Sequence, residues 1–265
     1  MFPFIRLGPF LLQLPGLALL VGIWIGSSLA EKEAARLKLN VAAVYNLIFF
    51  GLVTGIVGAR LAYAARYLSA YLANPLGLLA LTPATLSPNA GLVIGLAVAA
   101  LFGWRKKLPL RPTLDALAPG LAAFMVTLGV AHIMSGDAFG APAYGRDGVT
   151  PLPWSIYLWD DYRHPSQIYE TIATLVVFAV AWKRPLDQPV DGINFLLVVA
   201  LSVAARVLLE AFRGDSVIWP GGFRAAQVVG LLVLAAALWL MKAWAQPTAP
   251  RPLFGEETLK PEAHS

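Results

Sequence analysis

The stretch VAAVYNLIFFGLVTGIVGARLA, residues 41–62, decides the fold of this chain. Arg60 is its only charged residue, and the stretch is long enough for a helix to cross the hydrocarbon core of a bilayer, which takes about 20 apolar residues. Gly51 and Gly55 lie one helical turn apart and would let a neighbouring helix approach closely. Similar apolar runs recur along the chain, at residues 11–30, 89–104, 116–134, 165–182, 193–212 and 223–241.

The composition agrees with a membrane protein. Of the 265 residues, 58% are hydrophobic and 13% are charged, whereas a soluble globular domain averages roughly 25% charged residues. We therefore predict an all-α fold, a polytopic integral membrane bundle of about seven transmembrane helices that forms one domain over residues 1–245. The apolar run 75–86 is too short to span, and Pro83 interrupts it, so we expect an interfacial or re-entrant segment. The chain has no Cys, which excludes disulfides and a thiolate supplied by the protein.

Basic residues alternate between the connections in a way that predicts orientation. The connections before the second, fourth and sixth runs and after the seventh are rich in Lys and Arg, and the remaining connections are poor in them. The rich set is Lys32, Arg36, Lys38, Arg105, Lys106, Lys107, Arg111, Lys183, Arg184, Lys242, Arg251 and Lys260. Because positive charge marks the cytoplasmic side, we predict the N-terminus outside and the C-terminus in the cytoplasm. Charge in short clusters between apolar runs is not a nucleic-acid footprint, so no nucleic-acid partner is expected.

Two connections and the start of the chain need separate interpretation. Residues 246–265 are rich in Pro and charge, which predicts a disordered cytoplasmic tail. The longest connection, the outside loop 135–164, carries Trp154 and Trp159, and its length and aromatic content indicate a functional loop at the membrane interface. A cleaved signal peptide ending at residues 28–30 is the alternative for the first run, but the basic cluster follows that run instead of preceding it.

Charged groups inside spans are functional candidates, because each costs roughly 2.5 to 3.5 kcal/mol to insert. Arg60 is one such group, with snorkelling to the outer headgroups as the structural alternative. Arg206, Glu210 and Arg213 recur at i, i+4 and i+7, so we expect them on one helical stripe near the outer end of their span. A structural ladder of ion pairs explains this spacing. However, two arginines for one carboxylate leave a positive charge that a phosphate would complete.

The run RHPSQIYE, residues 163–170, opens the fifth apolar stretch with several polar side chains. Pro165 suits a first helical turn, and capping would explain one polar residue but not four, so this helix must face polar neighbours. His132 stands near the outer end of the fourth stretch, followed by Asp137, which we expect to orient the imidazole or to bind a substrate hydroxyl. A lone membrane His is also commonly a structural hydrogen-bonder. The three His show no metal-ligand spacing.

These residues carry a resemblance to the prolipoprotein diacylglyceryl transferase family of bacterial inner-membrane enzymes. RHPSQIYE (163–170) is the most specific part and resembles the family signature closely. Further similar motifs follow in the family order: GP (8–9), GLALLVG (16–22), GARLAY (58–63), NPL (74–76), SGDAFG (135–140) and RVLLEAFR (206–213). The resemblance covers most of the chain.

The resemblance implies that the diacylglyceryl group of phosphatidylglycerol is transferred to the thiol of a lipobox cysteine in a prolipoprotein signal peptide, without cofactor or metal. The reaction needs a thiolate, although an unperturbed Cys has a pKa of about 8.5, and a cationic clamp on the leaving phosphate. We assign catalytic roles to His132, Asp137 and Arg213. Substrate binding is assigned to Arg60, Asn89, Arg163, His164, Gln167, Tyr169, Glu170, Arg206 and Glu210.

The sequence departs from the family at four positions. NAG (89–91) stands where the family has His-Gly-Gly, Gly129 where it has an Arg, His132 where it has an Asn, and Pro15 where it has a Tyr. The main hypothesis is a phospholipid-dependent transferase in which His132 is the base. A non-catalytic or differently specific relative that binds an anionic lipid headgroup is the second hypothesis, and a small transporter is the third.

Overall fold

The computed structural model describes residues 4–7, 10–79, 85–183 and 191–245. The predicted tail, residues 246–265, and part of the predicted re-entrant segment, residues 80–84, lie outside the described residues. In chain order the elements are β1 (Phe4–Leu7), β2 (Phe10–Gln13), α1 (Leu14–Arg36), α2 (Val41–Arg66), α3 (Leu68–Ala73), η1 (Pro75–Leu79), α4 (Pro88–Arg105), α5 (Leu110–Ser135), β3 (Ile156–Leu158), β4 (Asp161–Arg163), α6 (Ser166–Lys183), α7 (Ile193–Leu209), η3 (Glu210–Phe212) and α8 (Ala225–Ala245).

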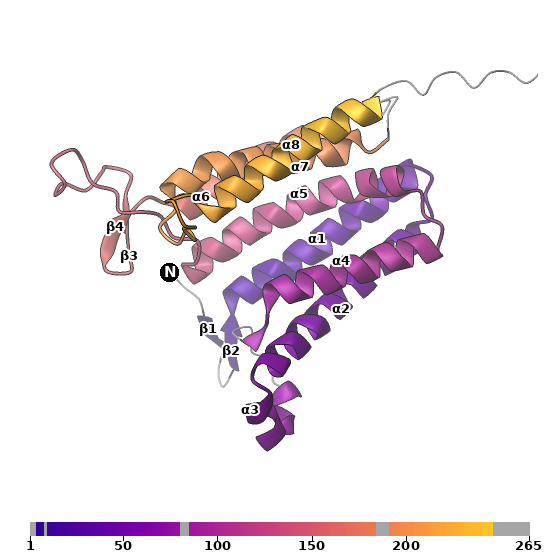
Figure 1. Cartoon of the computed structure of the whole chain (residues 1–265), viewed down its shortest axis with the longest axis horizontal. Coiled ribbons are helices and arrows are strands. Elements are labelled where there is room, and N and C mark those ends of the chain that lie inside the picture. The colour runs from indigo at the N-terminus through magenta and orange to yellow at the C-terminus, as the bar shows by residue number, and fades with distance from the viewer. Residues whose placement is uncertain (1–3, 8–9, 80–84, 184–190, 246–265) are drawn as a thin grey trace, which may run out of the picture.

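The long helices form a bundle with α1 and α5 in the middle (Figure 1). Helices α6, α7 and α8 pack on the α5 side, and the pair α2–α4 joins the bundle through α1. A helix satisfies its backbone hydrogen bonds within itself, which is the requirement for crossing hydrocarbon. The predicted all-α membrane bundle is therefore confirmed, and the two short antiparallel hairpins, β1–β2 and β3–β4, lie outside the long helices.

Small residues allow the helices to approach closely. A Cβ built on Gly91 of α4 would lie 2.7 Å from the Gly55 carbonyl oxygen of α2, and one on Gly95 would lie 2.7 Å from that of Gly51. The expectation that Gly51 and Gly55 permit close helix approach is thus confirmed. In the α1–α5 pair, a Cβ on Gly26 would lie 2.8 Å from the backbone of α5. Such contacts replace the hydrophobic effect, which does not drive helix association in lipid.

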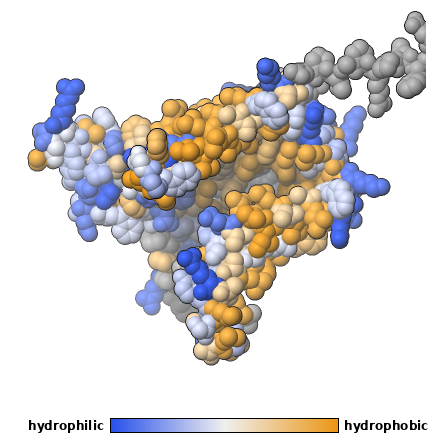
Figure 2. All heavy atoms as spheres, in the orientation of Figure 1, coloured by the Kyte–Doolittle hydropathy of each residue, from blue (hydrophilic) through white to orange (hydrophobic). Residues whose placement is uncertain are grey.

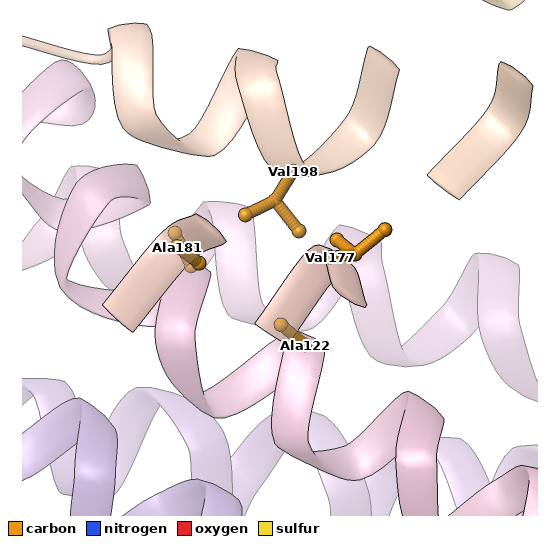
Figure 3. Close-up of a cluster of buried hydrophobic side chains, with 5 residues drawn as sticks. Ala122, Val177, Ala181 and Val198 are labelled. Atoms are coloured by element: carbon orange, nitrogen blue, oxygen red, sulfur yellow. The ribbon is translucent and has the colours of Figure 1, made fainter. Parts of the chain in front are cut away.

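The core between α5, α6 and α7 is built from small aliphatic side chains. Ala122 of α5, Val177 and Ala181 of α6, and Val198 of α7 meet there (Figure 3). By contrast, large apolar side chains point outward over the sides of the helices, and hydrophilic residues gather at the two ends of the bundle (Figure 2). Trp239 of α8, for example, is 67% exposed. An apolar exterior of this extent belongs in a bilayer.

Six of the helical segments are long and apolar enough to cross a membrane: α1, α2, α4, α5, residues 193–212 and α8. The fifth predicted run forms α6, which packs between α5 and α7 but is not one of the six. Its first turns carry Ser166, Gln167 and Glu170, and these polar groups lower its hydropathy. The chain is a multi-pass membrane protein, and a seventh crossing together with the N-out orientation stays a prediction.

The long loop between α5 and α6 is ordered by its own contacts. The Tyr144 hydroxyl donates a 2.5 Å hydrogen bond to Asp161 at β4, and this bond raises the pKa of Tyr144. Asp147 accepts from the backbone N–H groups of Val149 and Thr150 and from the Thr150 hydroxyl, and these bonds lower the pKa of its carboxyl. The loop therefore has a defined conformation before any substrate arrives.

The predicted topology can be tested with single cysteines, because the chain has none of its own. Val149 is exposed in the loop after α5, and Lys106 is exposed in the connection before it. We expect a membrane-impermeant maleimide to label Val149→Cys in intact cells and to label Lys106→Cys only after permeabilisation. Labelling of both variants after permeabilisation is the control, and the reverse pattern in intact cells would contradict the predicted orientation.

Candidate active site

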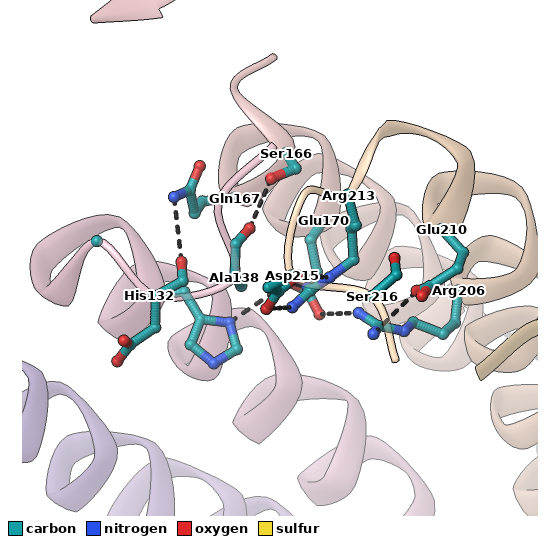
Figure 4. Close-up of polar contacts among 12 residues, drawn as sticks. His132, Ala138, Ser166, Gln167, Glu170, Arg206, Glu210, Arg213, Asp215 and Ser216 are labelled. Carbon is teal, nitrogen blue, oxygen red and sulfur yellow. Dashed lines mark hydrogen bonds and ion pairs between the residues drawn. The ribbon is translucent and has the colours of Figure 1, made fainter. Parts of the chain in front are cut away.

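The polar start of α6 fastens the loop that follows α5. Ser166 and Gln167 are buried, with 3% and 1% of their surface exposed. The Ser166 hydroxyl donates to the Ala138 carbonyl oxygen at 2.5 Å, and the Gln167 amide nitrogen donates to that of Asp137 at 3.1 Å (Figure 4). These two hydrogen bonds fix the first turn of α6 against the loop after α5, and Pro165 directly precedes that turn.

Glu170 lies one turn deeper and is the centre of a charged cluster (Figure 4). Its Oε2 lies 3.3 Å from Nδ1 of His132 on α5 and 3.5 Å from Nη1 of Arg213. Its Oε1 lies 4.0 Å from Nη1 of Arg206 on α7. One carboxylate therefore joins three basic side chains that come from three different parts of the chain.

Glu210 holds Arg206 from the other side. Its carboxylate lies 3.0 Å from Nη2 of Arg206, and the residue has no exposed surface. Neither carboxylate oxygen of Glu210 has a hydrogen bond of good geometry among the described residues. A buried carboxylate with a single ion pair depends on that partner, so Arg206 and Glu210 stabilise each other's position.

The expectation of one helical stripe is wrong for Arg213. Helix α7 ends at Leu209, one turn of 3₁₀ helix follows, and Arg213 has extended backbone angles, φ −85° and ψ 138°. Its side chain is paired with Asp215, Nε to Oδ1 at 2.8 Å and Nη2 to Oδ2 at 2.6 Å. The inference of an uncompensated cation is therefore wrong too, because a carboxylate two residues away satisfies it.

Arg224 organises the turn that carries Asp215. Its Nη1 donates to the carbonyl oxygens of Glu210 and Arg213, the latter at 3.2 Å, and to the Ser216 hydroxyl at 3.0 Å. Sequence reasoning singled out neither Arg224 nor Asp215 as a site residue. The one available signal was their place in the segment directly after the RVLLEAFR motif.

The cluster borders an apolar cavity of about 230 Å³ between α5, α6 and α7. Glu170, Arg206 and Arg213 form its charged end, and Met125, Val203 and Leu209 are among the apolar residues of its wall. A cavity with two arginines at one end and a hydrocarbon-like wall suits a molecule that has an anionic group joined to an apolar part.

Arg163 and His164 support the loop beside the cluster. The guanidinium of Arg163 donates to the carbonyl oxygens of Leu158 at 3.0 Å and Gly140 at 3.3 Å. The ring of His164 packs 5.2 Å from that of Phe212, and its Nδ1 lies 3.5 Å from the Tyr169 hydroxyl. Burial lowers the pKa of His164.

Arg60 lies on α2, away from the Glu170 cluster, and no contact between them is found among the described residues. It donates to the carbonyl oxygens of Gly77 at 2.5 Å, Leu78 at 3.3 Å and Thr85 at 3.0 Å. Arg60 therefore holds the segment that the sequence predicted to be interfacial or re-entrant.

The other predicted site residues are peripheral in this structure. Asn89 is exposed in the first turn of α4, and Asp137 is exposed after α5, where its backbone and not its carboxylate contacts Gln167. The expected partner of His132 was Asp137, whereas the structure gives Glu170. No three His, Asp or Glu side chains converge as a metal site within the described part of the chain.

Two of the departures from the family pattern have a local physical reason. Gly129 of α5 packs directly against Thr171 of α6, where any side chain would collide. Pro15 lies in the first turn of α1, where its missing N–H costs no intrahelical hydrogen bond.

The fold and this cluster define a multi-pass membrane protein with a charged site beside an apolar cavity at one end of its bundle. The model of the family described as prolipoprotein diacylglyceryl transferase matches residues 3–243. The chain belongs to this family, and it is a transferase, as the motifs predicted.

Curated relatives cover nearly the whole chain. A phosphatidylglycerol–prolipoprotein diacylglyceryl transferase of Trichormus variabilis is 28% identical over 256 residues, which are 89% of this chain and 88% of the relative. Proteins of the same description from Geobacillus kaustophilus and Streptococcus equi subsp. equi are each 29% identical, covering 92% and 88% of this chain and 94% and 91% of their own lengths.

Proposed function

We propose that this chain transfers the diacylglyceryl group of phosphatidylglycerol to the thiol of the lipobox cysteine of a prolipoprotein, in the bacterial cytoplasmic membrane. The observation that carries the proposal is that Glu170, Arg206 and Arg213 belong both to the charged cluster and to the apolar cavity. A phospholipid needs both surfaces at once, because its phosphate is anionic and its acyl chains are apolar. The names of the curated relatives support the choice of the two substrates.

The reaction is a substitution at the carbon of the diacylglycerol unit that is esterified to the phosphate. The thiol loses its proton to a base, the sulfur forms a bond to this carbon, and the carbon–oxygen bond to phosphate breaks. The bonding electrons leave with the oxygen, so glycerol phosphate is released with its negative charge. Arg206 and Arg213 stabilise that developing charge, and Arg offers two parallel N–H donors to a phosphate.

His132 is proposed as the base, with Glu170 as its positioning residue. A carboxylate can only accept hydrogen bonds, so Nδ1 of His132 donates to Glu170 across the 3.3 Å contact. The other ring nitrogen, Nε2, is then unprotonated and able to take the thiol proton. Asp137 is exposed beside the cluster and is proposed to bind a headgroup hydroxyl.

Asp215 is a proposed competitor for the phosphate. The described cluster holds two arginines against the carboxylates of Glu170, Glu210 and Asp215, so it has no surplus of positive charge. A phosphate that binds Arg213 bidentately must take the place of Asp215, since both compete for the same N–H groups.

The function is tested directly with labelled phosphatidylglycerol and a lipobox peptide. The purified chain in detergent or vesicles is expected to produce a thioether-linked diacylglyceryl peptide and one glycerol phosphate for each peptide modified. A Cys→Ser peptide is the control and should not be modified. Phosphatidylglycerol binding without any product would instead identify a non-catalytic relative.

The phosphate assignment predicts opposite effects for two neighbouring substitutions. Arg213→Lys should lower kcat/KM for phosphatidylglycerol about 10²-fold or more, because a point charge cannot reproduce the bidentate contact. Asp215→Asn should lower KM several-fold with little change in kcat, because it removes the competing charge. If Asp215→Asn lost as much activity as Arg213→Lys, Asp215 would be a positioning residue for Arg213 and not a competitor.

The base assignment predicts that His132→Ala lowers kcat by roughly 10² to 10⁴-fold. Raising the pH should partly restore the variant, because more of the substrate thiol then ionises without a base. Asn89→Ala is the matched comparison and should have a smaller effect, since Asn89 is exposed on α4. Wild-type turnover with an unchanged pH profile in His132→Ala would return this residue to a structural role.

A further inference from the structure

A second cavity lies at the opposite end of the bundle, and it is more polar than the first. It measures about 270 Å³ and is formed where α1 and α6 end, beside the first turns of α5 and α7. Glu170 and Trp182 lie 12 residues apart on helix α6, so this cavity is about 18 Å from Glu170 at 1.5 Å per residue. Among the described residues, the second cavity shares no lining residue with the cavity beside Glu170, so it is a separate site.

The charges of this second cavity are arranged by depth. Glu33 is buried, with 8% of its surface exposed, and it forms an ion pair with Arg36 at 3.4 Å. The Arg36 side chain is 60% exposed, and Lys32 is exposed as well. The cavity therefore has two exposed cations at its mouth and a carboxylate in its interior.

Asn194 and Trp182 complete the lining. Asn194 Oδ1 is buried and has no hydrogen-bond donor among the described residues. Trp182 is 57% exposed at the end of α6, the position typical of an aromatic residue at a membrane–water interface. The interior thus offers hydrogen-bond acceptors that need donors, and the mouth lies at headgroup depth.

We propose that this cavity binds the headgroup of an aminophospholipid from the leaflet on that side. The phosphate lies between Lys32 and Arg36 at the mouth, and the primary ammonium enters the cavity and donates to Glu33 and, after a small rotation of its amide, to Asn194. Basic pockets between transmembrane helices recur as lipid headgroup sites, and a buried charge inside a membrane protein marks a functional position.

The negative charge of the Glu33 carboxylate selects the kind of headgroup. A purely anionic headgroup places no positive charge beside the buried carboxylate, whereas an ammonium supplies both the charge and three N–H donors. A quaternary choline headgroup has the same charge but no N–H. At roughly 30 Å³ for each water molecule, the cavity has room for a headgroup and not only for a few waters.

This lipid site does not depend on the proposed transfer reaction, and it is tested without measuring turnover. Native mass spectrometry of the full chain, exposed to equal amounts of dioleoyl phosphatidylethanolamine, phosphatidylglycerol and phosphatidylcholine, gives the relative retention of each lipid. Phosphatidylethanolamine is expected to be retained about tenfold over phosphatidylcholine, and the N-monomethyl and N,N-dimethyl lipids should fall between them in order.

Matched variants locate this preference in the cavity. Glu33→Gln should abolish the preference for phosphatidylethanolamine over phosphatidylcholine, whereas Glu31→Gln, two residues away on the same helix and outside the cavity lining, should keep it. Lys32→Ala should reduce the retention of phosphatidylethanolamine and phosphatidylcholine equally, because both lipids carry the phosphate.

Two results would overturn the proposal: equal retention of the N-methyl series by the wild type, or an unchanged preference for phosphatidylethanolamine over phosphatidylcholine in Glu33→Gln. If Glu33→Gln does not fold, the order of the N-methyl series on the wild-type protein decides alone.

Discussion

The constraint on which the whole structure depends is the free-energy cost of an unpaired polar or charged group in hydrocarbon. It requires the backbone to form long helices, and it removes the hydrophobic effect as a force between them. The helices then associate through close backbone contact, which is why Gly91 of α4 meets Gly55 of α2 and Gly26 of α1 meets Gly120 of α5. The same cost favours charge at the ends of the bundle, and both cavities that are bordered by charged residues lie there.

At the end of the bundle that holds the candidate site, this constraint makes Glu170 the central residue. A carboxylate at this depth must be paired, and the partners His132, Arg206 and Arg213 come from elements that are distant in sequence. The pairing therefore fixes the ends of α5 and α7 relative to α6 as well as creating a charged site. Arg206 and Arg213 already have carboxylate partners in this network, so phosphate binding as proposed is an exchange of partners more than the filling of an empty site.

Much of this was readable in the sequence, and the reason is physical. Each run of apolar residues had to become a helix, so the fold class followed from run length and charge content, and the motif at residues 163–170 marked the start of α6. The partners were harder to predict. The helical period was extended through Arg213, but α7 ends at Leu209, and the bidentate pairing with Asp215 depends on that break. The partners of Arg60 were not predictable either, because they are backbone carbonyls of a non-helical segment and leave no mark in side-chain patterns.

The departures from the family pattern on α5 are best understood as one coupled change. The family resemblance places an Arg at position 129 and an Asn at position 132, whereas this chain has Gly and His. Positions three apart share a helical face, so the basic group stays on the side of α5 that faces α6 but lies one turn nearer the end of the helix. Gly129 lets α5 approach Thr171 more closely than any other residue would, and His132 then reaches Glu170 at 3.3 Å. Glu170 thereby keeps a basic partner from α5, and that partner is an imidazole in place of the guanidinium that the family resemblance places there.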